Sequence, residues 1–128
     1  MMTKILVTGG AGFIGSGIAE KLAEQKQNFV VIVDNLLTGN QNKIPYSKHD
    51  NIKFIRCDVN EFVDLSTVFT SYSFDYVFHY AALVGVKRTL DNPVKVLNDL
   101  NGIRNILNLS KNTGVKRVYY SSSSEVYG

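Results

Sequence analysis

Short runs of apolar residues alternate along the chain with stretches in which apolar residues recur every three or four positions. The first run comprises residues 5–7, and the strongest comprises residues 29–33, where four of the five residues are β-branched. Because β-branched residues favour extended backbone, both runs predict buried strands. Similar runs predict three more strands at residues 52–55, 76–78 and 115–120.

Stretches with the apolar spacing of a helix lie between several of these predicted strands. Apolar residues recur at this spacing over residues 12–22, 62–72 and 97–107. The third stretch is preceded by Pro93, a residue suited to the first turn of a helix, and it ends before Gly114, where a glycine cap is expected. The chain therefore alternates between strands and helices from end to end.

This alternation predicts an α/β protein with a Rossmann-type, doubly wound parallel sheet. Strands that are apolar along their whole length are buried on both faces, as in a parallel sheet covered by helices on each side. Right-handed crossovers with one reversal of direction predict the strand order 3-2-1-4-5. We expect residues 1–128 to form a single domain.

Composition excludes several other classes of protein. Apolar residues make up 45% of the chain, which is enough to form a core, yet no run approaches the roughly 20 residues that a membrane span requires. The net charge of +3 is too small to indicate nucleic acid as a partner. The single cysteine, Cys57, excludes an internal disulfide, so we expect a cytoplasmic protein.

A glycine-rich turn between the first strand and the first helix is the first chemical signal. Gly9, Gly12 and Gly15 are spaced by three residues. The first permits a tight turn, the second lets the backbone approach a pyrophosphate, and the third allows close packing of helix on strand. The N-terminus of the helix adds unpaired N–H groups that favour phosphate. A glycine turn without a ligand is the alternative.

A carboxylate at the end of the second strand agrees with this hypothesis. Asp34 follows Gly15 by 19 residues, close to the spacing expected for the group that binds a dinucleotide's ribose hydroxyls. A carboxylate there repels a 2′-phosphate, which favours NAD over NADP. A phosphate loop of the kinase type is excluded because Ser16 follows Gly15, where that loop requires lysine.

Five motifs occur in the order of one protein family. They are Thr8-Gly-Gly-Ala-Gly-Phe-Ile-Gly15, Asp34-Asn35-Leu36, Cys57-Asp58-Val59, His79-Tyr80-Ala81-Ala82 and Ser121-Ser-Ser-Ser-Glu-Val-Tyr-Gly128. Together they resemble the extended short-chain dehydrogenase/reductases, specifically the NAD-dependent nucleotide-sugar epimerase/dehydratase family. The resemblance covers the entire chain and implies that residues 1–128 form an NAD-binding Rossmann domain.

The resemblance also implies which residues bind the cofactor. It places the pyrophosphate on the glycine turn, the adenosine ribose beside Asp34 and Asn35, and the adenine against Asp58 and Val59. The complete implied set is Gly9, Gly12, Phe13, Ile14, Gly15, Asp34, Asn35, Asp58, Val59, Tyr80, Ala81 and Ala82. No cluster of Cys, His and carboxylate residues has metal-ligand spacing, so we expect no metal.

Two further residues are implied to be catalytic. Ser123 stands four residues before Tyr127, where the family has its catalytic Ser or Thr, and Glu125 lies between them. The family also uses a Tyr-x-x-x-Lys pair, which this sequence does not contain. From the resemblance we also expect the sixth strand and the substrate-binding domain of the family to be missing. We therefore expect an N-terminal piece of a longer enzyme that is inactive by itself.

For the full-length protein the resemblance implies a UDP-sugar 4-epimerase that works by transient oxidation to a keto-sugar. Its substrate would be a nucleotide sugar, and the protein would be a homodimer that takes part in carbohydrate metabolism. Ser124 argues against a dehydratase, which would have Asp there, whereas the Ser124-Glu125 pair resembles the decarboxylases. A non-catalytic NAD-binding module is the alternative from another class.

Overall fold

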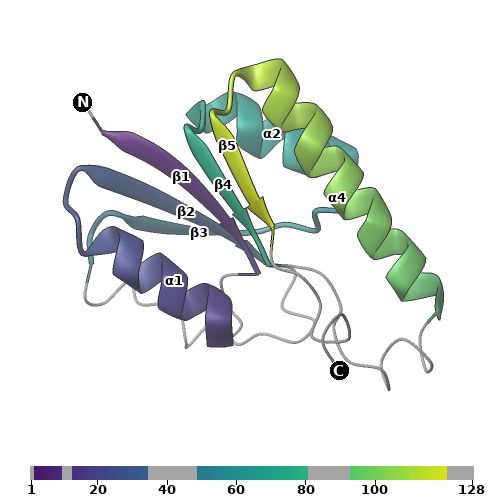
Figure 1. The fold of residues 1–128 in the computed structure, drawn as a ribbon, viewed down its shortest axis with the longest axis horizontal. Helices are drawn as coiled ribbons and strands as arrows, with labels where there is room; N and C mark the ends of the chain where they lie inside the picture. The colour runs from purple at the N-terminus through teal and green to yellow at the C-terminus, as the bar shows by residue number, and fades with distance from the viewer. Residues whose placement is uncertain (1, 10–12, 35–48, 81–92, 121–128) are drawn as a thin grey trace.

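A computed structural model describes residues 2–9, 13–34, 49–80 and 93–120, with backbone only for residues 13–14 and 93–100. Figure 1 shows the strands side by side in one sheet with helices on both of its faces. The elements are β1 (Thr3–Thr8), α1 (Phe13–Ala23), β2 (Asn28–Asp34), β3 (Ile52–Arg56), α2 (Phe62–Tyr72), β4 (Tyr76–His79), α4 (Pro93–Thr113) and β5 (Arg117–Tyr120).

The sheet confirms the topology predicted from the sequence. Its strand order is β3-β2-β1-β4-β5, and every pair of neighbouring strands is parallel. The chain winds outward from β1 to β3 and then returns to place β4 on the other side of β1. The winding direction therefore reverses between β1 and β4, which makes this the switch point where α/β sheets usually bind ligands.

Alternating residues of the strands build one core on each face of the sheet. The face covered by α1 buries Ile5, Val7, Ala19, Ala23, Val30, Ile32 and Ile52. The face covered by α2 and α4 buries Leu6, Val31, Val33, Cys57, Val59, Leu65, Val68, Phe69, Phe74, Val77, Ile106 and Leu109. This period of two explains why the central strands read as continuous apolar runs.

The fifth strand begins later than the apolar run predicts, at Arg117 rather than at residue 115. Gly114 has a left-handed backbone conformation with φ of 81°. The N–H of Val115 donates to the carbonyl of Ser110 at 3.1 Å, which completes a Schellman motif at the end of α4. Val115 therefore belongs to the helix cap, and pairing with β4 starts two residues later.

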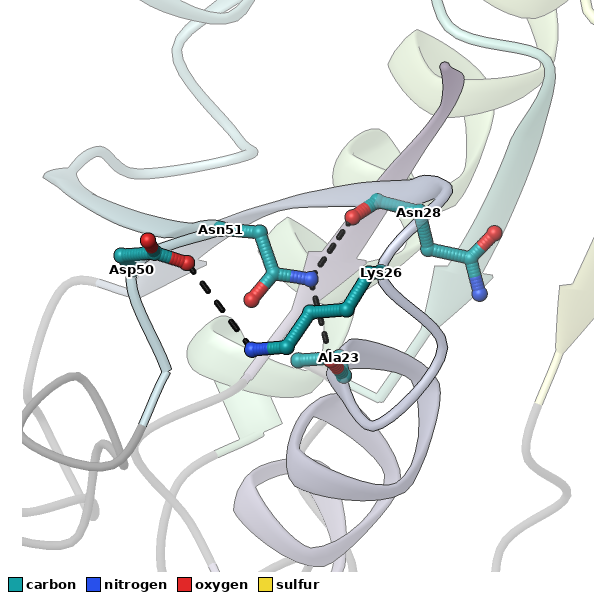
Figure 2. Close-up of polar contacts among 5 residues, drawn as sticks. All are labelled: Ala23, Lys26, Asn28, Asp50 and Asn51. Atoms are coloured by element: carbon teal, nitrogen blue, oxygen red, sulfur yellow. Dashed lines mark hydrogen bonds and ion pairs between the residues drawn. The ribbon is translucent and has the colours of Figure 1, made fainter. Parts of the chain in front are cut away.

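Polar side chains fix the C-terminal end of α1 to the amino ends of β2 and β3. The Nδ2 group of Asn51 donates to the carbonyl of Ala23 at 2.9 Å and to that of Asn28 at 2.8 Å (Figure 2). Asn28 donates in turn to the carbonyl of Leu22 at 2.9 Å. The bonds to Leu22 and Ala23 add donors to carbonyl groups in the last turn of α1, where a helix leaves carbonyls without intrahelical partners.

Candidate functional site

The candidate site is formed where the carboxyl ends of adjacent parallel strands meet. Thr8 ends β1 and pairs in register with Val33 of β2 on one side and with His79 of β4 on the other. Asp34 ends β2 one residue further on, and it pairs with Arg56 of β3. Residues that are far apart in sequence are thereby gathered at one edge of the sheet, beside the switch point.

Gly9 opens the turn that leaves β1, and its backbone requires glycine. Its φ of 72° lies in the left-handed region, which side chains with a Cβ rarely adopt. Its N–H donates to the carbonyl of Val33 at 2.8 Å, so the turn begins directly beside Asp34. Gly15, in the first turns of α1, is buried as close packing of helix on strand requires.

Asp34 and Asp58 stand at the ends of neighbouring strands. Asp34 is 9% exposed, and its carbonyl accepts the N–H of Cys57 at 3.1 Å. Asp58 is half-buried at the start of the turn that follows β3. Its Oδ1 accepts the N–H of Asn60 at 2.9 Å, and its carbonyl accepts that of Glu61 at 3.0 Å. The Asp58 carboxylate is therefore held by its own turn.

Thr8 connects β1 to β4 through its side chain. Its Oγ1 accepts the N–H of Tyr80 at 3.0 Å and lies 2.7 Å from Nδ1 of His79. The hydroxyl has one proton and two acceptor lone pairs, so it can accept from Tyr80 and still pair with Nδ1 in either tautomer of the ring. Within the described residues, Nε2 of His79 has no hydrogen-bond partner.

His79 and Cys57 are both buried in the structure. His79 is 2% exposed and its ring stacks on Tyr120, with ring centroids 5.7 Å apart. Burial lowers the pKa of His79 from 6.5 to about 4, so the ring is neutral at physiological pH. Burial, with added repulsion from Asp64 and Asp58, raises the pKa of the Cys57 thiol to about 11. At neutral pH the thiol of Cys57 therefore stays protonated and the ring of His79 stays neutral, which favours structural roles for both side chains.

Among the described residues, two hollows lie on the face of the sheet that α2 and α4 cover. One, of about 430 Å³, lies between β3 and α2 and is lined in part by Lys53, Arg56 and Asp64. The other, of about 220 Å³, lies between α4 and the ends of β4 and β5, where His79 and Tyr120 line it. Asp34 lines neither of these hollows.

Several predicted site residues lie outside the described part of the chain. They are Gly12, Asn35, Ala81, Ala82, Ser123 and Glu125. Phe13 and Ile14 form the first residues of α1, where only the backbone is described. The structure places Gly9, Asp34 and Tyr80 around the ends of β1, β2 and β4, with Gly15 in α1 and with Asp58 and Val59 following β3.

The structure also adds residues to which the sequence gave no role. Thr8 joins two strand ends, and Asn105 of α4 donates to the carbonyl of Val59 at 2.9 Å. Gly102, one turn earlier in α4, is buried against the same turn. The one signal in the sequence is a glycine inside a helical stretch, which often has a packing reason.

The described residues contain no group of three or more His, Cys, Asp or Glu side chains that could hold a metal ion. None of the helices in the described ranges is long and apolar enough to cross a membrane.

Comparison with known proteins gives consistent matches. The model of the NAD dependent epimerase/dehydratase family matches residues 5–128. The chain is 39% identical to a UDP-glucuronate 4-epimerase of Thermodesulfobacterium geofontis, a match that covers 95% of this chain and 40% of that protein. It is 37% identical to UDP-glucuronic acid decarboxylase 6 of Arabidopsis thaliana, covering 98% of this chain and 35% of the relative.

Solved structures agree with these sequence matches. The crystal structure of Thermus thermophilus UDP-glucose 4-epimerase in complex with NAD superposes with a TM-score of 0.82 and 33% identity. This match covers 91% of the chain and 36% of the epimerase. The chain spans about 40% or less of the length of the relatives described here.

Proposed function

Because the chain belongs to the NAD-dependent epimerase/dehydratase family, we propose that it is the cofactor-binding part of an NAD-dependent nucleotide-sugar epimerase. One observation carries this proposal. Gly9, with a positive φ, opens the turn from β1 directly beside Asp34 at the end of β2. A pyrophosphate on that turn and a ribose on that carboxylate belong to the same dinucleotide.

The described residues fit NAD along the row of strand ends. The glycine turn and the N-terminus of α1 would hold the pyrophosphate, since this end of a helix offers N–H groups and a favourable dipole. Asp34 would accept the hydroxyls of the adenosine ribose. The adenine would then lie further out, beyond β2, against Asp58 and Val59.

The other end of the cofactor would lie on the opposite side of the switch point. Tyr80, Ala81 and Ala82 follow β4 and would line the nicotinamide side, while Asn35 would lie near the adenosine ribose. When bound, NAD supplies a hydride acceptor for the sugar. Ser123 would donate or accept a hydrogen bond at the sugar oxygen whose proton leaves, which holds that oxygen in place during the transfer.

A decarboxylase is the second candidate, and the Ser124-Glu125 pair favours it. Glu125 would then supply an acid or base to the keto-sugar after the shared oxidation step. The named relatives include both a 4-epimerase and a decarboxylase that act on UDP-glucuronate or its acid form. The substrate that we propose is therefore a UDP-sugar. The resemblance supports a homodimer, and the single cysteine supports a cytoplasmic location.

The experiment that tests the proposal compares NAD with NADP by calorimetric titration of the chain. Two like charges about 4 Å apart repel by about 4 kcal/mol at an effective dielectric constant of 20. We therefore expect Asp34 to disfavour the 2′-phosphate of NADP, so that NAD binds at least about tenfold more tightly.

The variant Asp34→Asn should reduce this preference because it removes the charge and keeps the shape of the side chain. Asp50→Asn is the matched control, since Asp50 is exposed at the amino end of β3, away from the site. The control should keep the preference of the unmodified chain. No detectable binding of NAD, or equal affinity for both cofactors in the unmodified chain, would contradict the proposal.

A further inference from the structure

We propose that Gly102 and Asn105 of α4 are positioning residues that set the preference of the chain for adenine. They act through the turn of residues 58–61, which carries the Asp58 carboxylate. This inference rests on the proposed function, because it assigns the adenine of NAD to Asp58. In this proposal α4, which packs on one face of the sheet, fixes the part of the site that binds adenine.

Asn105 holds the turn by a hydrogen bond across a long stretch of sequence. Its Nδ2 donates to the carbonyl of Val59 at 2.9 Å in a half-buried position. Val59 is 6% exposed and packs in the same core as Ile106 and Leu109 of α4. An apolar contact and a backbone hydrogen bond therefore fix the residue that directly follows Asp58.

Gly102 lets the helix come close enough for this contact. A Cβ at this position would lie 2.7 Å from Oδ1 of Asn60 and 2.8 Å from Cγ2 of Val59, closer than real Cβ atoms pack. Val59 is short, branched and buried, so it has little freedom to move aside. Any side chain at position 102 would therefore push the turn away from α4.

Hydrogen bonds within the turn link the position of Asp58 to the contact between the turn and α4. Oδ1 of Asp58 accepts the N–H of Asn60, and the Asp58 carbonyl accepts the N–H of Glu61. In the described part of the chain, no other donor is bonded to this carboxylate. Because Cys57 is bonded to the end of β2, a shift of the turn changes the position of the Asp58 carboxylate relative to Asp34.

Adenine and hypoxanthine distinguish a well-placed carboxylate from a displaced one. Adenine carries an amino group that donates hydrogen bonds, whereas hypoxanthine carries a carbonyl oxygen at the same ring position. A carboxylate only accepts hydrogen bonds, so it binds the amino group and repels the carbonyl. We expect the unmodified chain to bind NAD about tenfold more tightly than nicotinamide hypoxanthine dinucleotide, because hydrogen bonds to charged groups are strong.

Two variants disturb the contact between α4 and the turn of residues 58–61 in different ways. Asn105→Leu removes the donor and keeps a similar volume, while Gly102→Ala adds one carbon where there is no room. In each variant we expect the tenfold preference for NAD over the hypoxanthine analogue to fall to about threefold or less. The two dissociation constants are measured by calorimetric titration of the same preparation.

The ratio of dissociation constants separates positioning from loss of stability. Partial unfolding of a sample weakens the apparent affinity for both ligands by the same factor, so the ratio of the two dissociation constants stays unchanged. Asn108→Leu is the control for Asn105→Leu because Asn108 is exposed on the same helix. Gly17→Ala is the control for Gly102→Ala, since a Cβ at Gly17 would meet nothing within 4 Å. Both controls should keep the tenfold ratio.

The possible results distinguish this inference from the proposed function. A reduced ratio in Asn105→Leu and Gly102→Ala, with unchanged controls, supports the inference. An unchanged ratio in these two variants, or an unmodified chain that binds both dinucleotides equally, overturns it while NAD binding itself still supports the proposed function. An unmodified chain that does not bind NAD overturns both.

Discussion

His79 is a buried imidazole whose ring has only one hydrogen-bonded nitrogen in the described part of the chain. Thr8 is the partner of Nδ1, and the ring lies against Tyr120. Protonation would place a positive charge on a side chain that is 2% exposed. Burial disfavours that charge, which is why the pKa of His79 falls to about 4.

The lowered pKa makes the stability of the chain depend on pH in a definite direction. Well above pH 6.5 the ring is neutral in both the folded and the unfolded chain, so the titration of His79 does not reduce the free energy of unfolding there. As the pH falls from 6.5 toward 4, the unfolded chain binds a proton that the folded chain does not. We expect a loss of roughly 3 kcal/mol from this residue over that window.

Urea unfolding at a series of pH values would measure this loss. The variant His79→Phe keeps an aromatic ring against Tyr120 and removes the titrating group. Its free energy of unfolding should be lower than that of the unmodified chain at pH 7, because the bond to Thr8 is lost. Between pH 6.5 and 4 its curve should fall less steeply. Parallel curves for the two proteins would show that His79 is not responsible.

The end of α1 depends on a side chain from a different element. Asn51 donates to carbonyl groups of both α1 and β2, and it is 6% exposed. Asn51→Ala would leave the carbonyls of Ala23 and Asn28 without this donor. Because buried unpaired carbonyls are costly, we expect the free energy of unfolding to decrease by about 2 kcal/mol. Chemical denaturation at pH 7 measures the change.

Lys26→Ala provides a control for this prediction in the same region (Figure 2). The Nζ of Lys26 lies 3.9 Å from the carboxylate of Asp50, and both side chains are mostly exposed. Exposed ion pairs of this kind contribute little, so the variant should unfold within about 0.5 kcal/mol of the unmodified chain. A cost for Lys26→Ala equal to that for Asn51→Ala would mean that the local charge, rather than Asn51, holds the helix end.

At the scale of the whole molecule, binding and turnover should be separable. No tyrosine in the sequence is followed four residues later by lysine, the catalytic pair that the resemblance implies for the family. We therefore expect the chain to bind NAD and to leave UDP-glucose and UDP-glucuronate unchanged. Conversion of the sugar nucleotide, followed by chromatography, and nicotinamide absorbance in single turnovers detect any reaction, with the Thermus thermophilus epimerase as the positive control on UDP-glucose. Accumulation of reduced nicotinamide with either sugar would contradict this expectation.

The fold could be predicted from the sequence because its signals are local. Within the run of residues 29–33, residues 30–33 are buried in the central strand β2, and β-branched residues favour extended backbone. The beginning of β5 was predicted two residues too early because Val115 is apolar but takes part in the cap of α4. Apolar character alone cannot distinguish these two roles.

The candidate site was predictable only in part. Gly9 and Asp34 carry recognisable spacing, and the structure places them side by side. The bonds from Thr8 to His79 and from Asn105 to Val59 join residues 71 and 46 positions apart. Nothing in the local sequence indicates such pairs, since they arise only when the sheet and α4 are packed together.

The bonds of Asn51 lie at the amino ends of the strands, whereas the candidate site lies at the carboxyl ends. Asn28, which Asn51 contacts, pairs in register with Thr3, and Thr8 is at the other end of the same six-residue strand. That strand is roughly 17 Å long, beyond the separation at which mutational effects are usually coupled. Substitutions at Asn51 can therefore change the stability of the fold without altering the strand ends where we propose that the dinucleotide binds.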